Sequence, residues 1–239
     1  MLFLGLLVIL CVGGGYYYLD ATNHLDELKG HWEKWTHATP KEEGATVSKS
    51  TLAMIEQMGG ESRDPQARER LAGVGKRLVQ GSLARETRFQ FDFHLLADRR
   101  SVNAFALPGG QIFITEGLYR LLGSEDQLAG VLAHEIGHVV GSHSAADKPL
   151  TGSAQEVANL REMKYSSDDE LGADRLGVLY LAAAGYQPQA MFEVMGILTL
   201  AAAGDRPPEF LNSHPLPGSR IQELRKVIAE YRFGRRVGN

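Results

Sequence analysis

Two histidines separated by three residues, with a glutamate directly after the first, form the most chemically specific pattern in the chain. The run is His134-Glu135-Ile136-Gly137-His138. On an α-helix the two imidazoles lie about one turn apart on one face, where both can bind one Zn²⁺. Glu135 is then placed to act as a general base toward the attacking water rather than as a ligand. The pattern therefore predicts a site of the zinc-peptidase type.

The residues around this run indicate that it lies on a buried helix. Ser124 and Gln127 have the spacing of a capping box, and the two acidic residues between them suit a helix N-terminus. The flanks Val131-Leu132 and Val139-Val140 are apolar. Because buried imidazoles need polar partners, these flanks favour metal ligation over the alternative, two partly exposed histidines on an amphipathic helix.

A catalytic zinc takes three protein ligands, so a third must come from elsewhere. One class of zinc peptidase uses a histidine six residues after the second, but Ser144 occupies that position and His143 falls one residue short. Another class uses a glutamate from a later helix. Glu170 and Asp174 lie four residues apart in a stretch that opens with the helix cap Ser166. Glu170 can ligate zinc, and Asp174 can hold a ligand histidine by its other ring nitrogen; a plain acidic helix start is the alternative.

The composition limits the kinds of site that the chain can build. Its 239 residues are 44% hydrophobic and 23% charged, which is typical of one globular domain with an appendage at most. Cys11 is the only cysteine, so a metal site must use His, Asp and Glu. The net charge of −4 gives no basic footprint for nucleic acid, and we expect no nucleic-acid partner.

Hydrophobic periodicity places these residues in an α+β fold. Phe89, Phe91 and Phe93 alternate with other residues as in a strand, and two short apolar runs, 103–107 and 111–115, flank Pro108-Gly109-Gly110 as in a hairpin. The chain turns helical from Glu116 onward. The remaining patterns predict helices over residues 51–58, 66–80, 176–184, 189–203 and 220–231.

The first 20 residues are predicted to be a signal-anchor or a cleaved signal peptide, with a buried strand or helix as the third alternative. Residues 2–19 carry no charge and are just long enough to span a bilayer. Residues 21–49 would form a juxtamembrane segment and residues 50–239 the main domain. We expect a membrane-anchored chain whose catalytic domain is periplasmic or otherwise extracytoplasmic. Lys29, Lys34 and Lys41, read by the positive-inside rule, favour the alternative of a cytoplasmic domain.

Four segments together resemble metallopeptidase family forty-eight, which includes CaaX prenyl endopeptidases, bacterial heat-shock membrane proteases and mitochondrial and periplasmic quality-control proteases. Their order and spacing agree over roughly residues 50–232. Ser167 stands where the family usually has Arg, and Gly172 where it usually has an acidic residue. Neither is a ligand position. The matching segments are residues 103–110, 134–138 with His143, 165–174, and Ser213-His214-Pro215 with Arg220.

The resemblance implies a mostly helical, zincin-like metallopeptidase domain with one Zn²⁺ held by His134, His138 and Glu170. It places the His214 segment over the active site, where His214 could stabilise the oxyanion or occupy the open zinc position and keep the enzyme latent. A loop histidine that caps the last helix is the alternative. Arg220 could anchor this loop by pairing with an acidic helix residue.

The resemblance also places a substrate-binding strand beside the metal, formed by Asn103, Ala104, Phe105 and Ala106, along which an extended peptide could add. A simple core hairpin would satisfy the same residues.

The implied function is zinc-dependent endoproteolysis of misfolded or membrane-associated proteins. The alternative is a chaperone-like or assembly factor that binds polypeptide in the same groove, although such a factor would not need Glu135. A prenyl endopeptidase would need several membrane spans, and a structural zinc site would be closed by four ligands.

Overall fold

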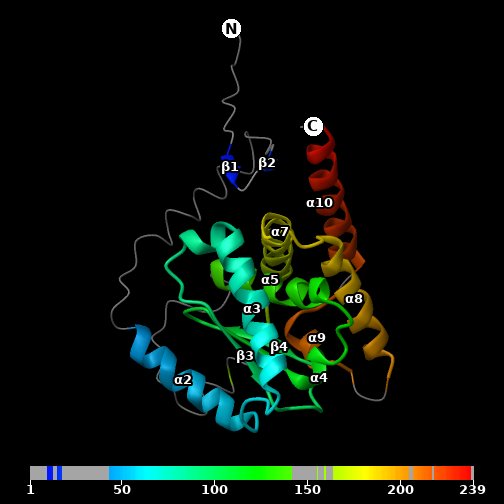
Figure 1. Ribbon diagram of the computed structural model, residues 1–239. Coiled ribbons are helices and arrows are strands. Elements are labelled where there is room, and N and C mark those ends of the chain that lie inside the picture. The colour runs from blue at the N-terminus through cyan, green and yellow to red at the C-terminus, as the bar shows by residue number, and fades with distance from the viewer. Residues whose placement is uncertain are drawn as a thin grey trace.

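Helices make up most of the computed structural model, and a small sheet lies among them (Figure 1). The structure describes residues 10–12, 15–17, 43–141, 155, 159, 164–204, 207–216 and 218–237. This α+β arrangement is the predicted one. The elements are β1 Leu10–Val12, β2 Gly15–Tyr17, α2 Glu43–Gln57, α3 Pro65–Gly81, the 3₁₀ helix η1 Leu83–Glu86, β3 Asp92–Leu96, β4 Ala104–Leu107, β5 Gln111–Thr115, α4 Glu116–Tyr119, α5 Glu125–Val140, α7 Ser167–Ala183, α8 Gln189–Ala202, α9 Phe210–Ser213 and α10 Gly218–Val237.

The main sheet has the strand order β3-β5-β4, so β4 lies at one edge of the three described strands. β4 and β5 pair antiparallel, with Ala104 opposite Ile114. The predicted hairpin is thus confirmed. Gly109 and Gly110 make its turn with φ values of 94° and 106°, a backbone region in which glycine meets no steric penalty.

The strand predicted from three alternating phenylalanines starts later than that pattern suggested. β3 begins at Asp92, which pairs with Gln111 at the start of β5 in a parallel ladder. The Asp92 N–H donates to the Gly110 carbonyl as the first bond of this ladder, and the Gln90 N–H donates to the Gly109 carbonyl in the hairpin turn. Phe89 and Phe91 therefore precede the strand, because their segment of backbone lies beside the hairpin turn and not beside β5.

The two faces of the sheet carry different layers. One face packs against α3 and α5 through strand residues that include Leu95, Ala106 and Ile112. The opposite face is covered by α2, whose buried Met54 and Met58 contact a separate set of apolar residues, Leu96, Phe105, Leu107 and Phe113. The sheet is therefore a middle layer, and α5 lies between it and α7 (Figure 1).

The central helix α5 is buried from Leu128 to its last residue, Val140. The Ser124 side chain caps its start by accepting from the Gln127 N–H, as predicted. The Gln127 side chain does not complete the capping box but accepts from Gly123 N–H. A Cβ on Gly137 would lie 2.7 Å from the carbonyl oxygen of Ala173, so glycine lets α5 and α7 approach closely there.

Only parts of the N-terminal segment are described. β1 and β2 form an antiparallel pair within residues 10–17, and α2 begins at Glu43. None of the helices in the described ranges is long and apolar enough to cross a bilayer. The predicted anchor and juxtamembrane segment fall mostly outside the described residues, as does His143, so those assignments stay predictions.

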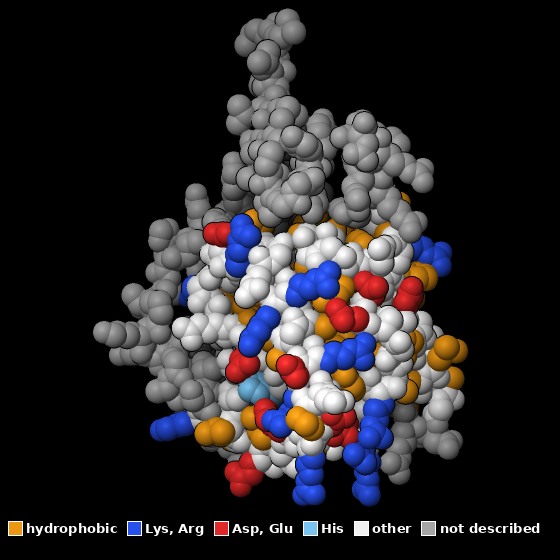
Figure 2. Space-filling view, in the orientation of Figure 1, with side chains coloured by type: hydrophobic (Ala, Val, Ile, Leu, Met, Phe, Trp, Pro, Cys, Tyr) orange, Lys and Arg blue, Asp and Glu red, His pale blue; other side chains and the backbone are white. Residues whose placement is uncertain are grey.

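Acidic and basic side chains are interspersed on the face of the molecule shown in Figure 2. The described surface carries ion pairs such as Arg175–Glu223, in which Arg175 Nη2 lies 2.8 Å from Glu223 Oε1. Exposed pairs of this kind contribute about 0–1 kcal/mol each. The buried charged groups around α5 and α7 affect stability more than these surface pairs do.

Candidate metal centre

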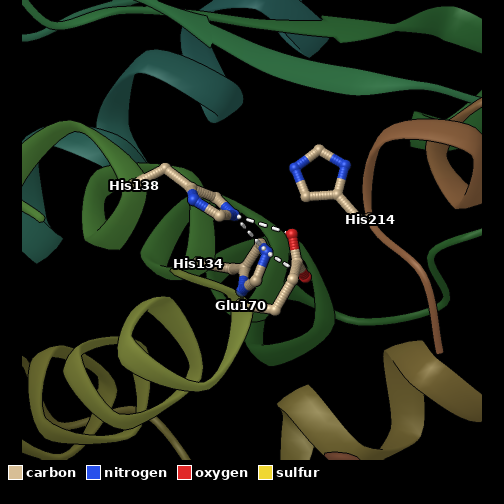
Figure 3. A group of neighbouring side chains, drawn as sticks. All are labelled: His134, His138, Glu170 and His214. Atoms are coloured by element: carbon tan, nitrogen blue, oxygen red, sulfur yellow. Dashed lines mark hydrogen bonds and ion pairs between the residues drawn. The ribbon is translucent and has the colours of Figure 1, made fainter. Parts of the chain in front are cut away.

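Helices α5 and α7 bring together three side chains that the sequence predicted to bind one zinc. His134 and His138 lie one turn apart on α5, and Glu170 faces them from α7 (Figure 3). The two Nε2 atoms are 3.0 Å apart, His138 Nε2 is 3.3 Å from Glu170 Oε1, and His134 Nε2 is 3.6 Å from Glu170 Oε2. Ligand atoms about 2.0–2.1 Å from one tetrahedral zinc lie roughly 3.3–3.4 Å apart. The spacing of these three groups therefore fits one zinc ion.

Glu170 reaches this position because α7 starts where the sequence indicated. Ser166 caps the helix by accepting from the Asp169 N–H, and the Asp169 carboxylate accepts in return from the Ser166 N–H, which completes a capping box. Glu170 and Asp174 then fall on one face, toward α5. The predicted Ser cap and acidic first turn are both present.

His214 approaches the same cluster from the end of α9. With His134, His138 and Glu170 it forms a buried group whose potential ligand atoms all lie within 4.8 Å of one another (Figure 3). Its Nε2 is 3.6 Å from Glu135 Oε1. On its other side, Nδ1 lies 3.2 Å from the Phe210 carbonyl and 2.9 Å from Ser213 Oγ. The Ser213 hydroxyl donates to the same carbonyl, so a proton on Nδ1 satisfies all these contacts and leaves the Nε2 lone pair facing the site.

Several buried electron-pair donors at the site indicate whether a cation fits there. Both oxygens of Glu135 and Nε2 of His214 are buried and have no hydrogen-bond partner among the described residues. Burial raises the pKa of Glu135 to about 8 and that of Glu170 to about 9, against the opposing charge of Arg220. A bound cation would satisfy such electron-pair donors and favour the ionised carboxylates. The donor set of two imidazoles and a carboxylate suits Zn²⁺.

A buried network of charges holds His134 from behind. Asp174 Oδ1 lies 3.0 Å from His134 Nδ1, so the proton sits on Nδ1 and Nε2 is left for a metal. Arg220 donates to Asp174 through Nε at 2.7 Å and Nη2 at 2.8 Å, and it also pairs with Glu170. Burial raises the pKa of Asp174, but the hydrogen bonds from Arg220 and His134 outweigh it and hold the pKa below its usual value. Arg220 Nη1 also donates to the Pro215 carbonyl, which ties the His214 loop to this network.

The stretch of chain that holds this cluster matches the model of peptidase family M48, as two segments over residues 65–149 and 148–228. The chain belongs to peptidase family M48. Members of the family are zinc metallopeptidases, and the buried group on α5, α7 and α9 supplies suitable ligands. The family resemblance predicted from the motifs is thereby confirmed.

Proteins of a bacterium and a yeast are similar to this chain over most of its length. A beta-barrel assembly-enhancing protease of Escherichia coli (strain K12) is 32% identical over 199 residues, which cover 71% of this chain and 40% of that protein. Mitochondrial metalloendopeptidase OMA1 of Schizosaccharomyces pombe is 28% identical over 172 residues, covering 63% of this chain and 50% of the relative. The chain thus spans less than two thirds of the length of these relatives.

The predicted substrate strand lies beside the helix that carries His134 and His138, because β4 packs against α5. Ala104, Phe105 and Ala106 are all buried, and Phe105 faces α2 in the second apolar cluster. Asn103 precedes the strand; its N–H donates to Thr115 Oγ1, and its side-chain oxygen is buried without a hydrogen-bond partner among the described residues. The geometry places these residues at the sheet edge, and their contact with substrate stays a prediction.

Two aromatic residues of the centre were not predicted from the sequence. The Phe210 ring stacks on the His214 imidazole with centroids 4.1 Å apart and planes 9° from parallel. The Tyr165 ring stacks on His138 at 3.7 Å. Phe210 lies four residues before His214, which is one helical turn, so recognition of α9 would have placed its ring there. Tyr165 opens the segment 165–174 that resembles the family, but that match did not indicate a contact between its ring and His138.

Proposed function

We propose that this M48 chain is a zinc-dependent metalloendopeptidase in which His134, His138 and Glu170 hold the metal and Glu135 is the general base. The observation that supports this most strongly is the buried group of two Nε2 atoms 3.0 Å apart and one carboxylate, whose Oε1 lies 3.3 Å from His138 Nε2 and whose Oε2 lies 3.6 Å from His134 Nε2. Glu135 is fully buried beside His134 in the chain and is not one of the grouped ligands. The arrangement separates binding of the metal from transfer of the proton.

Zinc at this centre supplies a Lewis acid that polarises a scissile carbonyl and acidifies water. The Glu135 carboxylate accepts a proton from the attacking water and returns it to the leaving nitrogen. Asp174 keeps the His134 imidazole in the tautomer that presents Nε2. Arg220 balances the buried negative charge of Asp174 and Glu170. Both act as positioning residues.

For His214 we propose the role of a resting-state ligand at the open metal position. The hydrogen bonds on Nδ1 leave its Nε2 as a lone pair, which can bind a metal. Stabilisation of an oxyanion needs a proton on Nε2 instead. Arg220, through the Pro215 carbonyl, holds the loop in this closed position. The loop must therefore move before a peptide can reach the metal.

The proposed substrates are extended segments of misfolded or membrane-associated proteins, bound along β4 as an added strand. Three things support this: the edge position of β4, its packing against α5, and the names of the relatives, which include an assembly-enhancing protease and a mitochondrial metalloendopeptidase. We further propose that residues 2–19, which carry no charge, attach the chain to a membrane with the protease domain on the extracytoplasmic side.

Cleavage of casein, an unfolded substrate, by the zinc-loaded full chain tests this function. We expect Glu135→Gln to keep the zinc and the fold and to abolish cleavage, since only the proton acceptor is lost. Glu86→Gln, an exposed change outside the centre, is the matched control and should cleave at the wild-type rate. Cleavage by zinc-loaded Glu135→Gln would refute its role as general base. A wild type that binds casein without cleaving it would support the chaperone-like alternative.

A further inference from the structure

Tyr165 places a buried aromatic ring against the metal centre from outside the ligand set. It directly precedes the cap residue of α7, the helix that carries Glu170. Its side chain is buried, and its ring lies nearly parallel to the His138 imidazole, with centroids 3.7 Å apart and planes 18° from parallel. Of the aromatic pairs in the described structure that include His138, this one is the closest.

The same residue also touches the His214 loop. The ring centroids of Tyr165 and His214 are 4.9 Å apart, and the Tyr165 N–H donates to the Ser213 carbonyl at 3.1 Å. The backbone bond fixes the start of α7 relative to the loop, so the ring has little freedom to move away from the imidazole it covers.

The described structure shows a different kind of contact at each of the two ligand histidines. A hydrogen bond from Nδ1 to Asp174 holds His134, and Arg220 braces that carboxylate. Against His138 the described structure places the flat face of a tyrosine. A metal-binding imidazole must keep the ring plane aligned with the bond from Nε2 to the metal, and a parallel ring in contact with it blocks tilting toward that side.

Tyr165 also forms part of the wall of a small cavity behind Glu170. The cavity holds about 30 Å³, room for a water molecule, and Arg220 and Glu170 line it together with the exposed residues Ser167 and Pro215. Tyr165 thus borders this cavity, and its ring contacts His138. Truncating the ring would enlarge the cavity toward the ligands and admit solvent where the metal site now excludes it.

We propose that Tyr165 is a positioning residue whose ring sets the orientation of His138 for zinc binding. The inference rests on the proposed zinc site and adds a residue to it. The ring face supplies the effect and the hydroxyl does not, because the contact with His138 is one of stacked planes. Loss of an outer partner of a zinc ligand commonly weakens metal affinity about 10–100-fold.

The experiment measures zinc affinity of the full chain by competition with a chromophoric chelator, together with the visible absorption spectrum of the Co²⁺-substituted protein. We expect Tyr165→Phe to match the wild type within about twofold, since it keeps the ring. Tyr165→Leu should bind zinc about 10–100-fold more weakly and show an altered Co²⁺ spectrum. Tyr180→Leu removes a buried ring from α7 away from the ligands and should lose stability but not metal affinity.

Equal zinc affinity in folded Tyr165→Leu and wild type would overturn the inference, as would an equal loss in Tyr165→Phe and Tyr165→Leu, which would assign the effect to the hydroxyl. If Tyr165→Leu does not fold, Tyr165→Met fills the space without a flat face and takes its place under the same expectations. A wild type without zinc affinity would refute the proposed function itself, so the two failures are distinguishable.

Discussion

The His214 imidazole is the group whose role depends most on a single proton. Its Nδ1 faces the Phe210 carbonyl, so Nε2 carries a lone pair, and Phe210 stacks on the ring and holds it in this orientation. Burial, and then the nearby His134 imidazole and Arg220 guanidinium, hold the pKa of His214 well below its usual value. The neutral, Nδ1-protonated ring is the form that can ligate a metal.

Replacement of His214 by alanine separates the two roles considered for it. If the loop favours the ligated position by about 1.4 kcal/mol, only about a tenth of the enzyme is open, and the variant should cleave casein about tenfold faster. The comparison must be made at matched zinc occupancy. A fall of about 10²–10³-fold would instead identify His214 as the donor to the oxyanion. An unchanged rate would reject both roles.

Residue-level chemistry was predictable here where the sequence spacing itself fixes the geometry. The four-residue spacing places His134 and His138 on one face of their helix whenever that helix forms. The same spacing places Glu170 and Asp174 on one face of α7. The ring of Tyr165 could not be placed, because its contact with His138 depends on how the start of α7 meets α5. The tie from Arg220 to Pro215 depends likewise on a loop closing over the site.

At the scale of elements, the metal centre depends on how closely α5 and α7 approach. Gly137 lies between the two ligand histidines at the point of contact, where a Cβ would meet Ala173 at 2.7 Å from O and 2.9 Å from Cα. Both of these atoms belong to the backbone of a buried helix, so they cannot move away by a rotamer change as a side chain could. The helices, with their ligands, would have to separate.

We therefore expect Gly137→Ala to lower the free energy of unfolding by about 1–3 kcal/mol and casein cleavage by roughly 10²-fold. Denaturant unfolding and the casein assay measure the two effects. Gly73→Ala on α3 is the control, since a Cβ there meets nothing within 4 Å. It should leave cleavage unchanged and raise stability by up to about 1 kcal/mol. Wild-type activity in Gly137→Ala would contradict the close-packing account.

The helices and the hairpin could be predicted because local signals define them: Ser124 and Ser166 as caps, and Gly109-Gly110 as a turn. The start of β3 could not, since the backbone before Asp92 bonds to the hairpin turn rather than to β5. The parallel pairing of β3 with β5 is a long-range contact, and the alternation of phenylalanines does not predict it. The α2 layer on the outer face likewise follows from packing, through Met54 and Met58 against Phe105 and Phe113.

At the scale of the whole molecule, the described core from α2 to α10 contains all the proposed metal ligands and both apolar clusters. We predict that deletion of residues 1–20 yields a protein that stays in solution without detergent and retains zinc and casein cleavage. Differential centrifugation and the casein assay check this. Recovery of the truncated chain only in detergent would mean that another membrane-binding element lies in the remaining residues.

The central claim is that one zinc is held by His134, His138 and Glu170, and elemental analysis of the purified protein tests it most directly. Wild type should contain close to one zinc per chain, and Glu170→Ala should lose it, because the site then lacks its only carboxylate ligand and would depend on His214, a residue of a movable loop, for a third ligand. Asp168→Asn removes an exposed acidic group from the same helical turn and should keep the wild-type content. A Glu170→Ala protein that retains its full zinc would contradict the ligand assignment on which the proposed function depends.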